Sequence, residues 1–193
     1  MEDAHEVYLH VRVVISVVLG LGLTRILSGL ARQVEHPGRE KLWGVHLIWA
    51  ATILVSAIHF WWWEFALERI ADWHFGLFLF VIGYAFIFYL LASLLFPADL
   101  KGYDGYQDYF LSRRRWFFGL LATSFVFDWF DTLIKGRERL AALGVEYDVR
   151  ILAMLLLCGI AAWTRDRRFH LLFAALYLLY HLSWIFRLYD RPG

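Results

Sequence analysis

The chain has 193 residues, of which 61% are hydrophobic, 19% aromatic and 19% charged. A soluble domain is usually about 45–50% apolar and about 25% charged, so this composition excludes a disordered chain, a collagen-like chain and a large soluble domain. The formal net charge of +1 gives no general attraction to nucleic acid, and the single cysteine, Cys158, excludes an intrachain disulfide and a multi-cysteine metal site.

The apolar residues fall into blocks of roughly 18–24 residues, each about long enough to cross a hydrocarbon layer of ~30 Å. The blocks are continuous rather than alternating, which favours helices over the strands of a β-barrel. The sequence therefore predicts an all-α, polytopic integral membrane protein in which residues 1–193 form one transmembrane domain of six helices. The predicted spans are residues 7–31, 42–64, 73–96, 116–134, 148–164 and 168–187.

Two features of the spans predict how they are arranged in the membrane. An offset of 94 residues aligns Asp72, Phe75 and Leu77 with Asp166, Phe169 and Leu171, which suggests a 3+3 internal repeat with inverted halves. When basic residues at the ends of the spans are included, connections one, three and five carry ten basic residues, against seven on the opposite side. By the positive-inside rule, both termini are predicted to lie on the outer side of a membrane, which we take to be a bacterial inner (cytoplasmic) membrane.

Several segments are predicted to contact lipid or other helices. Tyr103 and Tyr106 share one helical face in the connection before residue 116, and Arg113, Arg114 and Arg115 close it. This pattern predicts a short interfacial helix with tyrosines among the headgroups and arginines on lipid phosphates, or alternatively a gate or a docking surface. The outer aromatic belt is predicted at Trp61, Trp62 and Trp63. In the first span, small residues occur at every fourth position, namely Gly20, Thr24 and Ser28. They permit close helix packing within the monomer or in a homo-oligomer.

Ionisable side chains inside the spans are the candidate functional residues, because charge is expensive in hydrocarbon. Ser124, Asp128, Asp131 and Lys135 follow i, i+4, i+7 and i+11 spacing and so lie on one helical stripe. The sequence predicts a polar cluster between spans two, four and six, closed by span one, in which Arg12 pairs with one of the aspartates. The predicted transport pathway consists of Asp128, Asp131, His59, His181, Arg12, Ser124 and Arg25. Arg25 has the alternative of reaching lipid phosphate, and the two histidines have the alternative of simple packing.

These residues favour a channel or transporter for protons or small cations over two alternatives. In that interpretation Asp128 and Asp131 attract the cation, while His59 and His181 titrate near neutrality. One alternative is a non-catalytic scaffold or assembly protein, in which the buried charges are structural. The other is a b-type cytochrome with haem held by the two histidines, although their estimated depths differ by ~7 Å. No catalytic residue, metal site or required cofactor is predicted, since no serine or cysteine has an evident base partner.

Overall fold

The computed structural model describes residues 2–189, and these residues form helices joined by short connections, with no strand among them. The helices are α1 (Glu2–Glu35), α2 (Gly44–Trp63), the 3-10 helix η1 (Glu64–Arg69), α3 (Phe75–Leu95), α4 (Tyr106–Ile134), α5 (Arg137–Leu143), α6 (Val145–Trp163) and α7 (Arg167–Tyr189). The all-α prediction is confirmed.

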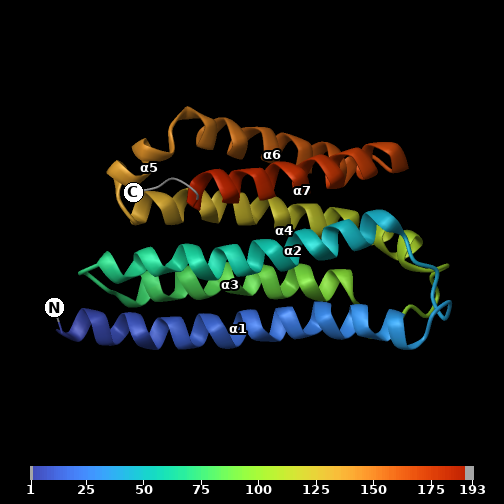
Figure 1. Ribbon diagram of the computed structural model, residues 1–193, viewed down its shortest axis with the longest axis horizontal. Helices are drawn as coiled ribbons and strands as arrows, with labels where there is room; N and C mark the ends of the chain where they lie inside the picture. Colours follow the sequence, from blue (N-terminus) through green and yellow to red (C-terminus); the bar gives the residue numbers. More distant parts are fainter. Residues whose placement is uncertain (1, 190–193) are drawn as a thin grey trace.

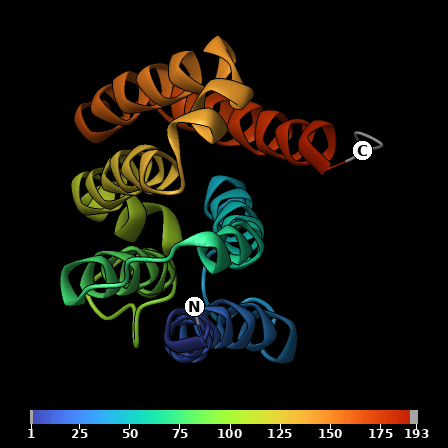
Figure 2. The ribbon, with the colours of Figure 1, turned by 90° about the vertical axis from the view of Figure 1, so that its left-hand side faces the viewer.

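The long helices lie side by side in one bundle (Figure 1). We call one end, formed by η1 and α5 and close to both termini, the termini end. We call the other end the turn end, and it holds the connections α1–α2, α3–α4 and α6–α7. Seen along the bundle (Figure 2), α1, α2 and α3 occupy one half, and α4, α6 and α7 occupy the other. The main packing partners are α1 with α3, α4 with α6, α3 with α4, and α2 with α7.

Five of the helical segments are long and apolar enough to cross a membrane, which supports an integral membrane protein. They are Ala4–Glu35, Gly44–Arg69, Phe75–Leu95, Tyr106–Ile134 and Arg167–Tyr189. The sequence predicts six, and the missing one is α6, whose 19 residues include the charged Glu146, Asp148 and Arg150. Large apolar side chains are exposed around the outside of the bundle, as on Val13, Val17, Leu156 and Leu176, and such a surface suits lipid rather than water.

The helix packing gives no support to the predicted 3+3 repeat. A repeat would pair α4 with α7 as α1 pairs with α3. Among the described residues α4 packs instead on α6 and α3, while α7 packs mainly on α2.

The separate interfacial helix predicted before residue 116 is wrong, because α4 runs unbroken from Tyr106 to Ile134. No proline or glycine interrupts Tyr106–Arg115, so the helix continues through the three arginines. Tyr106 is not among headgroups but buried, with its ring stacked 4.2 Å from His46. Tyr103 is half-buried and its hydroxyl accepts from Arg113.

Two further predictions about α1 and α2 need correction. The predicted aromatic belt is split: Trp62 is 55% exposed, whereas Trp63 is 7% exposed and turns into the bundle, because successive residues on a helix point about 100° apart. Gly20, Thr24 and Ser28 do not pack inside the monomer, since Thr24 and Ser28 are exposed and a Cβ on Gly20 would meet nothing within 4 Å. The close approach of α1 to α3 occurs at Gly22, where a Cβ would lie 3.3 Å from the Tyr89 backbone. Packing between protomers stays a prediction.

Aromatic rings fill the bundle between its centre and the turn end. Trp49 of α2 is fully buried, and its ring lies 5.3, 5.5 and 5.4 Å from the rings of Phe117, Phe118 and Phe173. We call these four residues the aromatic layer. Edge-to-face contacts of this kind add to the apolar burial of the rings, and the layer separates the polar residues described next from the turn end.

Candidate functional site

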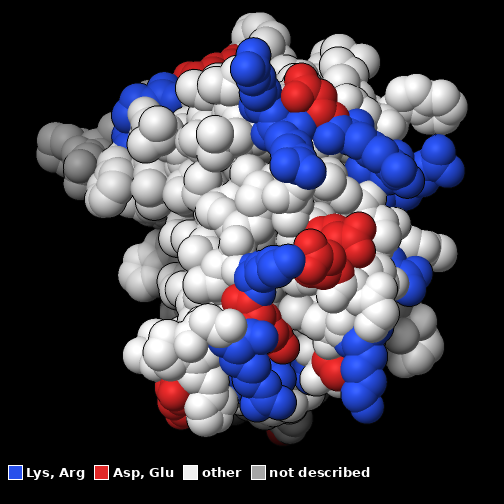
Figure 3. Space-filling view, turned by 90° about the vertical axis from the view of Figure 1, so that its right-hand side faces the viewer, with Lys and Arg blue, Asp and Glu red and all other residues white. Residues whose placement is uncertain are grey.

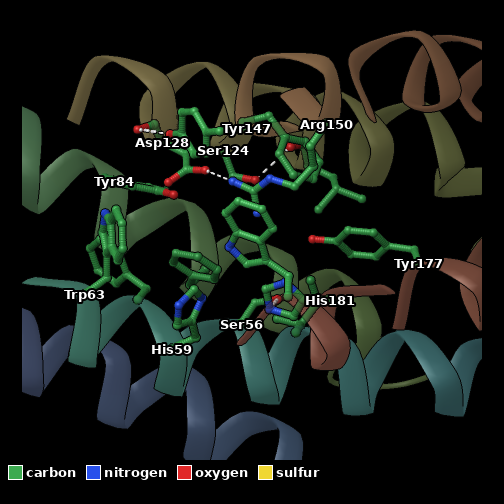
Figure 4. A pocket seen from close by; sticks show the side chains of 16 residues that line it. Ser56, His59, Trp63, Tyr84, Ser124, Asp128, Tyr147, Arg150, Tyr177 and His181 are labelled. Carbon is green, nitrogen blue, oxygen red and sulfur yellow. Dashed lines mark hydrogen bonds and ion pairs between the residues drawn. The ribbon is translucent and has the colours of Figure 1, made fainter. Parts of the chain in front are cut away.

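A polar cavity of about 50 Å³ lies inside the bundle on the termini side of the aromatic layer, between α2, α3, α4, α6 and α7 (Figure 4). A buried water needs at least about 10–15 Å³ of such volume, so there is room for about three water molecules. The side chains that line the cavity include those of Ser56, His59, Trp63, Tyr84, Ser124, Asp128, Tyr147, Arg150, Tyr177 and His181.

An ion pair between α4 and α6 forms one wall of the cavity. Arg150 Nη2 donates to Asp128 Oδ2 at 2.7 Å, and the Arg150 side chain is 5% exposed. The guanidinium also lies 4.9 Å from the ring centres of Tyr147 and Trp184. The Tyr147 hydroxyl donates to the Asp128 carbonyl at 2.9 Å and hydrogen-bonds Thr132 Oγ1 at 2.8 Å. α6 begins after Gly144, whose φ is +71°. Tyr147 in its first turn and Arg150 in its second both face α4.

The opposite wall carries two histidines from the paired helices α2 and α7. The rings of His59 and His181 meet edge to face with centres 5.5 Å apart. His181 Nε2 lies 3.3 Å from the Ser56 hydroxyl. The two rings contact each other directly, and the cavity beside them has a volume of only about 50 Å³. The residues present therefore do not fit the haem that the sequence left open.

Several polar atoms around the cavity have no protein partner. Among the described residues, His59 Nε2, His181 Nδ1 and Arg150 Nε are buried without a hydrogen bond. Buried polar groups in folded proteins are almost always satisfied by protein or by ordered water. The unpartnered nitrogens and the available volume together give the cavity both the hydrogen-bonding groups and the room to hold water.

A second buried charge cluster lies next to the cavity at the termini end. Lys135 Nζ donates to Asp131 Oδ2 at 2.5 Å and to Glu64 Oε1 at 2.8 Å, and the three side chains are at most 2% exposed. Trp63 Nε1 donates to Asp131 Oδ2 at 3.1 Å, and Trp63 also lines the cavity. We call these four residues the Lys135 cluster. Arg139 of α5 lies 4.0 Å from the centre of the Trp63 ring.

The structure brings together four of the seven predicted pathway residues, since Ser124, Asp128, His59 and His181 all line the cavity. Asp131 does not line it and belongs to the Lys135 cluster. The two arginines lie elsewhere. Arg12 makes no ion pair among the described residues and covers the Phe65 ring at 4.1 Å, while Arg25 Nε donates to the Phe96 carbonyl at 2.8 Å near the turn end.

The pairing of Arg12 with an aspartate is therefore wrong, and Arg150 is the arginine that the sequence reasoning missed. Glu64 and Tyr147 were missed as well, because both lie at the ends of predicted spans, where polar residues are ordinary. The available signal was Arg150 itself, which lies two positions inside the fifth predicted span and directly before the uncharged residues 151–164.

Within residues 2–189 no group of three or more histidine, cysteine or carboxylate side chains is placed to hold a metal ion. Comparisons with protein-family models, with curated proteins and with solved structures give no match. The function is therefore argued from the geometry of the cavity and the two charge clusters.

Proposed function

We propose that this protein is an integral membrane transporter that moves protons or small cations through the polar cavity between α2, α4, α6 and α7. The observation that carries the proposal is a cavity with room for water, lined by Asp128, Arg150, His59 and His181, inside a bundle whose outer surface is apolar. Ionisable residues at membrane depth are costly, and they usually mark ion or proton pathways.

The proposed roles follow from the positions of the side chains. Asp128 is the acidic group that attracts the cation or exchanges the proton, and Arg150, 2.7 Å away, orients its carboxylate. His59 and His181 each carry a ring nitrogen without a protein partner, so water in the cavity is able to link them to Asp128. In this proposal Arg150 takes the role that the sequence assigned to Arg12, and Asp131 takes no direct part.

The proposal includes α6 as a sixth span. Its 19 residues rise about 28 Å at 1.5 Å per residue, close to the thickness of the hydrocarbon layer. Glu146 and Asp148 are exposed in its first turn, at headgroup depth, and Asp128 compensates the charge of Arg150. The termini outside, the inner-membrane location, the 3+3 repeat and a homo-oligomer remain predictions of the sequence.

The test is proton flux into liposomes that contain the purified protein, driven by a potassium diffusion potential and followed with an internal pH dye. Asp128→Asn is expected to lower the protein-dependent flux by about a hundredfold, in line with the loss of a positioned proton-transfer group. Asp148→Asn is the matched control, because this aspartate lies in the exposed first turn of α6 and its loss should leave the flux unchanged. Equal flux in wild type and Asp128→Asn would remove the proposed role.

A second candidate, a non-catalytic membrane scaffold, is favoured by one observation. Asp128 and Asp131 are both already paired with basic side chains of the same chain, Arg150 and Lys135, and a purely structural bundle would also require this neutralisation. In that case liposomes containing the wild-type protein would show no proton flux above that of protein-free liposomes. Asp128→Asn would then lower only the stability of the bundle.

A further inference from the structure

The turn end of the bundle consists of two halves with different charge. The segments 106–116 and 163–170, which form the start of α4 and the turn between α6 and α7, carry six arginines and two aspartates. The segments 32–43 and 97–105 at the same end carry four basic and four acidic residues. In Figure 3, which faces the turn end, blue side chains gather in the upper part, over α4, α6 and α7, while blue and red alternate below. The excess positive charge is therefore confined to one half.

Five of these arginines are exposed, and we call them the arginine patch: Arg113, Arg115, Arg165, Arg167 and Arg168. None of them forms an ion pair with a described residue, whereas Lys41 in the other half pairs with Asp104 at 2.5 Å. The aspartate nearest in sequence, Asp166, is engaged with the backbone, because its Oδ1 accepts from the Arg168 N–H at 3.0 Å. The patch thus presents guanidinium groups that no carboxylate within residues 2–189 neutralises.

Contacts between α4 and the α6–α7 turn make the patch continuous. Arg114, buried beneath it, donates from Nη2 to the Trp163 carbonyl at 3.3 Å. The Gln107 amide oxygen, when oriented toward α7, accepts from Arg167 Nε at 2.6 Å. Arg115 lies 5.5 Å from the centre of the Trp163 ring. These contacts hold arginines from two distant parts of the sequence next to each other.

Exposed apolar side chains border the patch on the side toward the bundle. Trp116 is 68% exposed, Trp163 is 79% exposed and Leu171 is 47% exposed. Tryptophan concentrates at the boundary between headgroups and hydrocarbon, which places the arginines at headgroup depth. A ligand that fits both features has an anionic head for the guanidinium groups and an acyl chain for the apolar side chains.

We propose that the start of α4 and the α6–α7 turn form a binding site for an anionic phospholipid, with the arginine patch holding the headgroup phosphate. Guanidinium groups pair with phosphate through two parallel hydrogen bonds, and basic pockets between membrane helices commonly bind anionic headgroups. The inference does not depend on the transport proposal, since the cavity and the patch share no residue.

The test measures retention of phosphatidylglycerol by the purified full chain in neutral detergent, with native mass spectrometry over a lipid titration. Phosphatidylcholine serves as the zwitterionic comparison. The test variant is Arg115→Gln with Arg165→Gln and Arg168→Gln, and the control removes three charges from the other half through Arg32→Gln, Arg39→Gln and Lys101→Gln. Each patch arginine near anionic lipid contributes about fivefold, so the test variant is expected to lose about a hundredfold in affinity while the control retains it.

An equal loss of affinity for phosphatidylglycerol in the two triple variants would overturn the proposal. Equal retention of phosphatidylglycerol and phosphatidylcholine by the wild type would overturn it too. Displacement of bound lipid by inorganic phosphate at the same concentration would overturn it as well, because it would point to a free-phosphate site. If the test variant is unstable, substitution of the same three positions by lysine keeps the positive charge. This lysine variant should retain preference for phosphatidylglycerol, and loss of that preference would count against a headgroup site.

Discussion

The Lys135 cluster leads to a prediction about stability, tested by Lys135→Met. Lys135 supplies two charge-assisted hydrogen bonds, to Asp131 at 2.5 Å and to Glu64 at 2.8 Å, and its side chain is 0% exposed. A hydrogen bond to a charged group contributes about 1.5–3 kcal/mol, so two of them give about 3–6 kcal/mol. When a buried ion pair loses one partner, the measured loss of stability is about 3–5 kcal/mol. We expect Lys135→Met to lower the free energy of unfolding by about 3–5 kcal/mol.

The assay is denaturant-induced unfolding of the purified protein in detergent, followed by tryptophan fluorescence. The matched control is Lys41→Met, because Lys41 also forms an ion pair, at 2.5 Å from Asp104, but with side chains that are 74% and 78% exposed. An exposed pair contributes at most about 1 kcal/mol, so the control should change stability little.

A compensating variant separates the electrostatic cause from a loss of packing. When Glu64→Gln and Asp131→Asn accompany Lys135→Met, no buried charge is left without a partner, and most of the lost stability should return. The reasoning would be refuted if Lys135→Met alone unfolded at the same denaturant concentration as the wild type. It would also be refuted if the triple variant were less stable than the single one.

Three further predictions concern packing and hydrogen bonding, and all are read as changes in the same unfolding transition. Gly29→Ala should lower the free energy of unfolding by about 1–3 kcal/mol, because the added Cβ would lie 2.2 Å from the buried Phe96 ring. Gly20→Ala should change it little, because a Cβ there would meet nothing within 4 Å. Trp49→Ala should cost about 3–5 kcal/mol by opening a void in the aromatic layer, and an unchanged transition would show that this layer is loosely packed. Tyr147→Phe removes the hydroxyl that hydrogen-bonds the Asp128 carbonyl and Thr132 and should cost about 1–2 kcal/mol; no loss would mean that water replaces the hydroxyl.

The positions of most spans could be predicted from hydropathy alone. The predicted spans 42–64 and 73–96 correspond to α2, Gly44–Trp63, and α3, Phe75–Leu95, because Pro97 and charged connections mark their ends. The start of α4 could not be predicted in the same way. Arg113–Arg115 resembles the boundary of a hydrophobic block, but Arg113 and Arg115 are exposed, Arg114 is buried, and the helix continues through all three.

The partners that the buried charges find on other helices could not be predicted, because they depend on which helices lie opposite each other. Helical spacing placed Ser124 and Asp128 on one face, and the structure has both on the cavity. The same spacing put Asp131 and Lys135 with them, and these two residues do pair one turn apart, but they do not line the cavity and they share Glu64 of η1 as a third member. From the sequence we considered Arg12 on α1 as the partner of Asp128 and did not consider Arg150 on α6. The pairing of α4 with α6 selects Arg150, and nothing in the periodicity of either helix contains that information.

The aromatic layer has a consequence for leakage. Trp49 and its three phenylalanine neighbours pack against each other between the cavity and the turn end, so water that reaches the cavity would meet closely packed rings on that side. If the protein carries protons, the conformation described here is a sealed state, and a membrane holding many copies of it would keep its voltage. Passage would then require α2 and α7 to move away from α4 by at least the thickness of a ring. The rate of helix movement, rather than the rate of proton transfer, would then limit transport.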